Sequence, residues 1–289
     1  MDELNKPEQL SAWLEEARYV ADPDMLTSLF LLLKLRKPLL LEGPPGVGKT
    51  ESALVLSSLL DVPLIRLQCY EGLDISSAVY EWNYQRQLLA IRMQETSQMS
   101  VSEKEQKIFG EEYLLKRPLL QAITQAEKSP VLLIDELDRS DEEFEAFLLE
   151  LLSAFQITIP ELGTIRATHK PYVILTSNRT RELSDALKRR CLYHWIGYPG
   201  LEKEMSIVQK RLPGIEPSLL EAVVKHVQSF RQQKLSKTPG ISETIDWAES
   251  LMALGHRSLN NRAIEETLGA ILKSSEDIDL IRSQMTESV

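Results

Sequence analysis

The segment Pro38–Thr50, PLLLEGPPGVGKT, joins a short apolar run to a glycine-rich loop and leads into a helical pattern. Its last part, Gly43–Thr50, matches G-x-x-x-x-G-K-[ST], the signature of a phosphate-binding loop between a strand and a helix. Its glycines allow consecutive backbone N–H groups to converge on phosphate oxygens, and the positive end of the following helix strengthens that field. The segment therefore predicts an α/β fold with a nucleotide site.

Two residues of this loop have the chemistry that a bound ATP needs. We expect the Lys49 ammonium to bridge the β- and γ-phosphates and the Thr50 hydroxyl to hold Mg²⁺. The residues expected to contact the nucleotide are Gly43, Pro44, Pro45, Gly46, Val47, Gly48, Lys49, Thr50, Glu51 and Asp135. A glycine-rich turn that only caps a helix is the alternative, and the strand and helix on either side of the loop disfavour it.

Short apolar runs rich in strand-forming residues recur along the chain and are separated by helical patterns. This is typical of a parallel sheet covered on both faces. The expected strands are Pro38–Glu42, Leu64–Cys69, Val131–Ile134, Tyr172–Thr176 and Leu192–Ile196. Because ligands of open α/β sheets bind outside the carboxyl ends of the strands, the residues that follow these runs are expected to form one nucleotide site.

The connections between the strands give three further predictions. Apolar residues at helical spacing over Phe144–Phe155 predict an amphipathic helix. Alternation over Gln156–Ile159 and again over Thr164–Arg166 predicts a small hairpin. The stretch Ile75–Lys128 has a helical pattern but is unusually long for one crossover, so we expect an insertion there, with a turn at Ser97–Ser102.

Pro199–Gly200 marks a boundary, because four or five helical patterns follow it and no strand candidate of comparable strength does. These patterns include Glu221–Arg231, Thr244–Leu254 and Ala263–Leu272. We therefore expect an α/β domain over residues 1–198 and an all-helical domain over residues 199–289.

The strand VLLIDE, Val131–Glu136, ends in two adjacent carboxylates. A phosphate-bound Mg²⁺ needs oxygen ligands, so we expect Asp135 to support the metal together with Thr50. Glu136, one residue further, lies where a carboxylate can polarise water for in-line attack on the γ-phosphate, the role of a general base. An acidic pair at a strand end is common on its own, and the phosphate-binding loop favours the catalytic interpretation here.

Two later segments have both a functional and an ordinary interpretation. In TSNR, Thr176–Arg179, the Asn178 amide either orients the attacking water or simply occupies a turn. In LSDALKRRCL, the basic triplet Lys188, Arg189 and Arg190 is either a solvated surface or the source of an arginine finger. Such a finger stabilises transition-state charge and can come from a neighbouring subunit, which would make the active site an interface.

The composition is that of a globular protein, with 43% apolar and 26% charged residues. A net charge of −10 disfavours nucleic-acid binding, because that binding depends on neutralising phosphates with Lys and Arg. Cys69 and Cys191 lack metal-ligand or CxxC spacing, so neither a disulfide framework nor a zinc site is expected. The acidic N-terminus is unlike a signal peptide, and the apolar run Met25–Leu33 is too short to span a bilayer, so we expect a cytoplasmic protein without an integral membrane segment.

These motifs, in this order and with a hairpin ahead of Asn178, resemble the AAA+ ATPases of the MoxR branch from about Arg18 to the C-terminus. The stretches IRLQCYEGLD, YEWNYQRQLL, FQITIPELGT and KTPGISETIDW are most similar to the CoxD-like subgroup. The resemblance implies a three-layer α/β/α P-loop domain with an insert in its second helix, a hairpin before the sensor-1 strand, and an all-α lid domain. It also implies a homo-oligomeric ring, usually hexameric, with ATP between subunits.

The resemblance assigns roles to individual residues. The Walker A, Walker B and sensor-1 positions are Lys49 and Thr50, Asp135 and Glu136, and Asn178. Arg190 is the best match to the arginine finger, and Arg189 is the second. Many relatives have an arginine at the start of the third lid helix as sensor 2, whereas this sequence reads GISET there, with Ser242 and Glu243. Lid sensing of the γ-phosphate is therefore expected to be weaker, altered or supplied by another residue.

The resemblance favours a molecular chaperone, a ring whose ATP turnover remodels a protein client. MoxR-type proteins typically work with a von Willebrand factor A domain protein, and CoxD-like members resemble factors that mature the molybdenum–copper centre of carbon monoxide dehydrogenase. The implied partners are such an adaptor and a molybdenum hydroxylase client. An ATP-gated binding ring, in which hydrolysis only resets a scaffold, is the alternative. A DNA translocase is disfavoured by the acidic charge, and a small-molecule kinase does not need Asn178 and Arg190 in this order.

Overall fold

The chain forms two compact units, each assembled from segments that are distant in sequence. The computed structural model describes residues 6–93, 100, 103 and 107–287. The sheet unit comprises Thr27–Glu42 and Ala53–His194, and the lid unit comprises Met1–Leu26, Gly43–Ser52 and Trp195–Val289. The predicted division into domains 1–198 and 199–289 stays a prediction.

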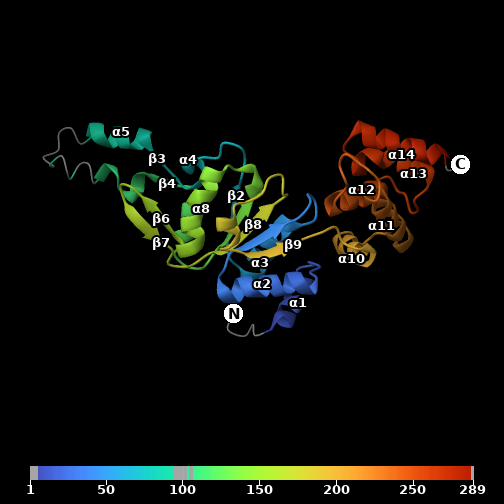
Figure 1. Cartoon of the computed structure of the whole chain (residues 1–289), viewed down its shortest axis with the longest axis horizontal. Helices are drawn as coiled ribbons and strands as arrows, with labels where there is room; N and C mark the ends of the chain where they lie inside the picture. Colours follow the sequence, from blue (N-terminus) through green and yellow to red (C-terminus); the bar gives the residue numbers. More distant parts are fainter. Residues whose placement is uncertain (1–5, 94–99, 101–102, 104–106, 288–289) are drawn as a thin grey trace. The chain divides into compact units, whose positions relative to one another are not determined.

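The sheet unit is built around the five strands that the sequence predicts. They are β1 (Leu39–Glu42), β2 (Leu64–Gln68), β5 (Val131–Asp135), β8 (Tyr172–Ser177) and β9 (Leu192–Trp195), in the order β2-β5-β8-β1-β9. The pairs β2–β5, β5–β8 and β8–β1 are parallel, so the carboxyl ends of these strands lie at one edge (Figure 1). All side chains of β1, β5 and β8 are buried, which explains their almost entirely apolar sequences.

Helices flank both faces of the sheet, as the α/β/α prediction requires. The amphipathic helix α8 (Glu142–Ala154) buries Leu148 in the same core cluster as Leu132 of β5. Helix α2 (Pro23–Leu35) lies on the other side of the sheet from α8 (Figure 1). The connections also contain α7 (Pro118–Ile123) and α9 (Asp185–Lys188), and short 3-10 turns at Glu111–Tyr113 and Leu137–Arg139.

The connection from β2 to β5 contains the expected insertion, but it is not helical throughout. It includes α4 (Ile75–Ala78), β3 (Tyr80–Trp82), α5 (Tyr84–Met93) and β4 (Leu114–Lys116), and β3 pairs antiparallel with β4. The prediction of a continuous helical pattern over Ile75–Lys128 is wrong at these two strands, because three-residue strands are too short to show alternation. Of the predicted turn at Ser97–Ser102, all but Ser100 lies outside the described residues.

The predicted hairpin ahead of β8 is confirmed. Strands β6 (Gln156–Ile159) and β7 (Gly163–Arg166) pair antiparallel, with Ile157 opposite Ile165. Ile157 and Ile159 are buried in the core of the sheet unit, whereas β7 is largely exposed.

The lid unit has the helical character expected after Pro199–Gly200. Its C-terminal helices are α10 (Leu201–Arg211), α11 (Pro217–Arg231), α12 (Ile241–Ala253), α13 (Asn261–Ile271) and α14 (Ser275–Glu287), and α1 (Pro7–Glu16) also belongs to it. Trp247 is fully buried in their core and donates from its indole nitrogen to the Thr267 hydroxyl at 2.7 Å. This hydrogen bond satisfies a polar group that burial would otherwise penalise.

Within the part of the chain that the structure describes, neither cysteine belongs to a disulfide or to a cluster that could hold a metal. Cys69 and Cys191 are free thiols, and burial raises the pKa of each to about 12, so both stay protonated at neutral pH. Among the described residues, no cluster of three or more His, Cys, Asp and Glu side chains could hold a metal. Within the same residues, no helix has the length and apolarity needed to cross a membrane.

Candidate functional site

The phosphate-binding loop follows β1 in the chain and leads into α3 (Lys49–Leu60). Gly46 and Gly48 have φ values of +74° and +91°, a region that residues with a Cβ atom adopt only at a cost. The Lys49 ammonium, in a residue that is 7% exposed, donates to the carbonyl oxygens of Gly43 and Pro44, both at 2.7 Å. The Lys49 side chain therefore folds back onto the backbone of its own loop.

The neighbours of the loop within the lid unit explain several of its residues. A Cβ atom on Gly43 would lie 2.0 Å from the carbonyl oxygen of Ile196, so only glycine fits there. Glu51, on the first turn of α3, forms an ion pair with Arg211 at 2.5 Å. Pro45 borders a cavity of about 450 Å³ whose other lining residues include Tyr198, Thr238, Glu243 and Lys273.

The two carboxylates after β5 are held from the neighbouring strand β8. Asp135 is 2% exposed and accepts a hydrogen bond from the Thr176 hydroxyl at 2.6 Å. The same hydroxyl oxygen accepts from the Glu136 amide at 2.9 Å. Glu136 has a left-handed backbone (φ +54°), which turns the chain sharply after the strand. One buried hydroxyl therefore fixes both acidic residues.

Cationic and amide side chains from β2 and from the 3-10 turn after β5 contact the same carboxylates. Arg66 donates from Nη2 to the second oxygen of Asp135 at 2.5 Å, and its side chain is 52% exposed. Glu136 Oε2 accepts from Gln68 Nε2 at 3.0 Å and from Arg139 Nη1 at 3.1 Å. These contacts orient both carboxylates at the carboxyl edge of the sheet.

Asp138 fixes the segment that follows β8. It is 3% exposed and accepts from the backbone amides of Asn178 at 3.1 Å and Thr180 at 2.9 Å, and from the Thr180 hydroxyl at 2.7 Å. Burial alone would raise the pKa of Asp138, but these hydrogen bonds favour the ionised form and hold its pKa below the ordinary value. The backbone of Asn178 is thereby tied to the turn that follows Glu136.

Asp135 and Glu136 lie at the carboxyl end of β5, and Asn178 directly follows the neighbouring parallel strand β8; the roles that the sequence gives them stay predictions. Arg66, Gln68 and Thr176 also contact the acidic pair, although the sequence alone predicts no role for them. The available signal was the position of Gln68 at the end of β2, which lies opposite Asp135 in the strand register. The residues from Gly43 to Ser52 belong to the lid unit, so their membership of the same site stays a prediction.

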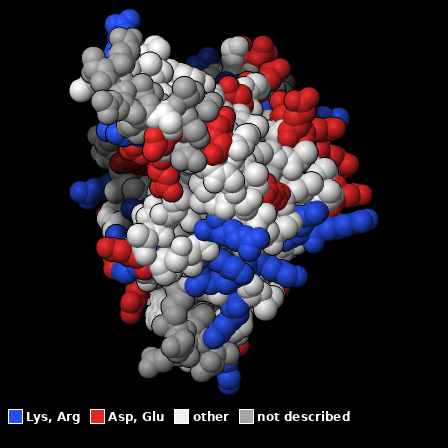
Figure 2. Space-filling view, turned by 90° about the vertical axis from the view of Figure 1, so that its left-hand side faces the viewer, with Lys and Arg blue, Asp and Glu red and all other residues white. Residues whose placement is uncertain are grey.

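Arg189 and Arg190 lie away from that edge of the sheet. They follow α9 and precede β9. The Leu192 amide at the start of β9 donates to the carbonyl oxygen of Pro38 at 2.7 Å, so the arginines lie towards the amino end of β1. Both arginines are exposed. Arg190 donates to the Ser153 hydroxyl at 2.6 Å and to the Ala186 carbonyl at 2.7 Å, so its guanidinium has a defined position. In the face that Figure 2 shows, many Lys and Arg side chains cluster in the lower middle and right, and most Asp and Glu side chains lie above this cluster or at the left edge.

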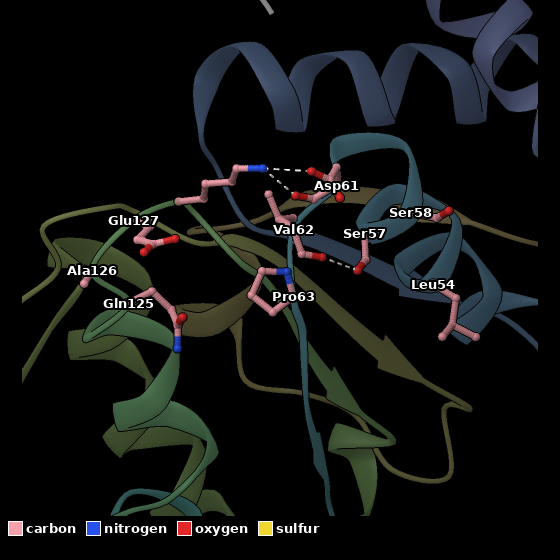
Figure 3. Close-up of a pocket in the computed structure, with 10 residues that line it drawn as sticks. Leu54, Ser57, Ser58, Asp61, Val62, Pro63, Gln125, Ala126 and Glu127 are labelled. Carbon is pink, nitrogen blue, oxygen red and sulfur yellow. Dashed lines mark hydrogen bonds and ion pairs between the residues drawn. The ribbon is translucent and has the colours of Figure 1, made fainter.

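The sheet unit also has a cavity of about 810 Å³ (Figure 3). Its walls are the end of α3 and the segments that precede β2 and β5, including Ser57, Val62 and Gln125. Lys128 bridges across it to Asp61 at 2.9 Å. The cavity lies at the amino ends of these strands, whereas ligands of such sheets bind at the carboxyl ends.

Comparison with known proteins gives a family and a fold. A family model described as "AAA domain (dynein-related subfamily)" matches residues 38–191. Uncharacterized proteins from Staphylococcus aureus (strain bovine RF122 / ET3-1) and Staphylococcus haemolyticus are 28% identical over 246 residues and 25% over 240, each match covering 81% of both chains. Two solved mutants of Thermotoga maritima RuvB have TM-scores of 0.53 and 0.51 at 18% identity. These matches cover 90% and 86% of this chain and 72% and 69% of those chains, and at this identity they show the fold alone.

We predict that Thr176→Val lowers the free energy of unfolding by about 1–3 kcal/mol, because valine keeps the shape but removes a donor to Asp135 and an acceptor for the Glu136 amide. Urea denaturation measures the change. The control is Thr164→Val on the exposed strand β7, which should change stability by less than about 0.5 kcal/mol. Equal effects of the two substitutions would show that the Thr176 hydroxyl does not hold the acidic pair.

Proposed function

We propose that this chain, which belongs to the AAA domain family (dynein-related subfamily), is a MoxR-type AAA+ ATPase that hydrolyses ATP to remodel a protein client. Family membership supports ATP-driven activity in general. The observation that carries the catalytic proposal is the acidic pair Asp135–Glu136, fixed by Thr176 beside Asn178 at the carboxyl ends of β5 and β8.

The residues present fit a Mg²⁺–ATP complex. Asp135 offers a carboxylate oxygen and Thr50 a hydroxyl, both of which are the hard oxygen ligands that Mg²⁺ prefers. Bound Mg²⁺ neutralises charge on the phosphate oxygens. We assign the loop Gly43–Thr50, with Glu51, to nucleotide contact, and within it Lys49 to the β- and γ-phosphates.

Glu136 is the proposed general base. Gln68 and Arg139 donate to one of its carboxylate oxygens, which orients the group, and the Thr176 hydroxyl fixes its backbone. A carboxylate placed in this way can accept a proton from a water molecule that attacks the γ-phosphate. Asn178, whose backbone Asp138 holds, is assigned to orienting that water.

We predict that Lys49→Ala removes ATP binding, because the loop loses its only side-chain cation for the phosphates. Glu136→Gln should instead bind ATP as the native protein does but turn it over about 10²–10⁴-fold more slowly, because an amide cannot accept the proton. Equilibrium binding of labelled ATP and phosphate release measure the two effects. The control Glu161→Gln, on the exposed hairpin turn, should leave both unchanged. Native-like turnover by Glu136→Gln would refute the assignment of the base.

We further propose a homo-oligomeric ring, usually hexameric in the family that this chain resembles, in which Arg190 acts on the ATP of a neighbouring subunit. Two observations support an action in trans. Arg190 is exposed and lies towards the amino end of the strands, away from Glu136 of its own chain. Its contacts with Ser153 and Ala186 fix the guanidinium without burying it. Arg189, also exposed, is the second candidate.

Arg190→Ala should bind ATP but hydrolyse it about 10³–10⁵-fold more slowly, the usual contribution of an arginine finger. If the finger acts in trans, mixing Arg190→Ala with the equally inactive Lys49→Ala protein should restore turnover, because some interfaces then combine an intact loop with an intact finger. Phosphate release against mixing ratio measures this. Arg189→Ala is the matched comparison, and a full loss with that variant alone would move the finger to Arg189. No recovery in any mixture would contradict action in trans.

The client and adaptor are proposed from the sequence resemblance. We propose a von Willebrand factor A domain adaptor and a client of the molybdenum hydroxylase class, whose metal centre the ring helps to mature. In the alternative, nucleotide binding alone orders the ring as a scaffold and hydrolysis resets it. The two differ in whether repeated client activation consumes ATP.

Glu136→Gln loaded with ATP should retain adaptor and client from a native extract, whereas Lys49→Ala should not. Mass spectrometry of the bound fraction identifies the partners, and loss of the partners on ATP removal is the control. Sustained client activation by Glu136→Gln without ATP consumption would overturn remodelling by hydrolysis and support the scaffold. Equal capture by both variants would contradict an ATP-dependent association.

A further inference from the structure

The first turn of α12 contacts the backbone of the phosphate-binding loop within the lid unit. The amides of Ile241 and Ser242 donate to the Gly46 carbonyl oxygen at 2.9 and 3.3 Å. The first N–H groups of a helix have no acceptor within the helix itself, and here the Gly46 carbonyl supplies one. The Gly46 carbonyl is therefore held towards α12.

The approach is close enough to require glycine on both sides. A Cβ atom on Gly240 would lie 2.8 Å from the Gly46 Cα and 2.9 Å from its carbonyl oxygen. A Cβ atom on Gly46 would lie 2.9 Å from Glu243 Oε2, and Gly46 also has φ of +74°. Backbone therefore packs directly on backbone, with no side chain between them.

Glu243 completes the contact. Its Oε2 accepts from the Gly240 amide at 2.9 Å, which is the reciprocal half of a capping box at the start of α12. This hydrogen bond fixes the turn that brings Ile241 and Ser242 to Gly46.

One buried ion pair and one buried carboxylate hold the segment ahead of α12. Arg231 and Glu204, 6% and 0% exposed at their side chains, form a two-pronged pair at 2.6 and 2.7 Å. Arg231 also donates to the Pro239 carbonyl at 2.8 Å, and Glu204 accepts from Thr244 of α12 at 2.7 Å. Asp277 of α14 accepts from the amides of Ser236 and Lys237. The start of α12 is thus fixed by the core of the lid unit.

We propose that Gly240 and Glu243 are positioning residues that set the Gly46–Val47 peptide plane for phosphate binding. In a trans peptide the C=O and the following N–H point in opposite directions, and no described peptide is cis. Holding the Gly46 carbonyl towards α12 therefore directs the Val47 N–H away from α12, as a donor on the other side of the loop. The inference rests on the proposed ATP binding and adds that the lid prepares a backbone donor of the loop for the triphosphate.

The test measures Mg–ATP affinity by calorimetry in full-length variants. Gly240→Ala should weaken binding about tenfold or more, because its Cβ atom separates α12 from Gly46 and releases the peptide plane. The matched control is Gly269→Ala on α13, where a Cβ atom meets nothing within 4 Å, and its affinity should equal that of the native protein. Glu243→Gln retains an acceptor oxygen and should bind ATP normally, whereas Glu243→Ala should bind more weakly.

Hydrogen exchange gives a readout that general destabilisation does not reproduce. The amides of Ile241 and Ser242 should lose protection in Gly240→Ala, while those in the core of α12 around Trp247 keep it. Native-like affinity in both Gly240→Ala and Glu243→Ala would overturn the inference. Failure of the native protein itself to bind Mg–ATP would instead refute the proposed function, so the two failures are distinguishable.

Discussion

A carboxylate that is 2% exposed needs donors for both of its oxygens, and Asp135 meets that requirement through strands on both sides of β5. Thr176 comes from β8 and Arg66 from β2, so the register of three parallel strands decides which groups meet at the sheet edge. Because the Thr176 hydroxyl also accepts from the Glu136 amide, the same requirement fixes the proposed base. The chemistry of this edge is therefore a consequence of strand order and register.

The strands and the principal acidic pair could be predicted because each is encoded locally. Val131–Asp135 is an uninterrupted apolar run with a carboxylate at its end, and a buried parallel strand requires that pattern. Strands β3 and β4 could not be predicted, because each has three residues and is defined only by pairing across α5. The same holds for Gln68, whose contact with Glu136 depends on how β2 aligns with β5.

Two separate requirements, backbone conformation and close packing, explain the glycines of the phosphate-binding loop. The motif explains them by the turn of the backbone around phosphate, and Gly48 has no neighbour that a Cβ atom would meet. Gly43 and Gly46, in contrast, also lie against the backbone at Ile196 and Gly240. These contacts join residues that are far apart in sequence, so no local pattern could reveal them. The segment GISET, notable in the sequence for lacking an arginine, contacts the loop through main-chain groups instead.

The two oxygens of Asp135 differ in how easily their partners can be exchanged. The Thr176 hydroxyl is buried with the strand, and replacing it would disturb both β5 and β8. Arg66 is 52% exposed at its side chain, so its guanidinium can return to water at little cost when another cation approaches. One oxygen is thus held by a buried hydroxyl and the other by a half-exposed arginine. In the proposed function, the oxygen that faces Arg66 is the one that would turn to Mg²⁺, while the bond from Thr176 keeps β5 and β8 joined.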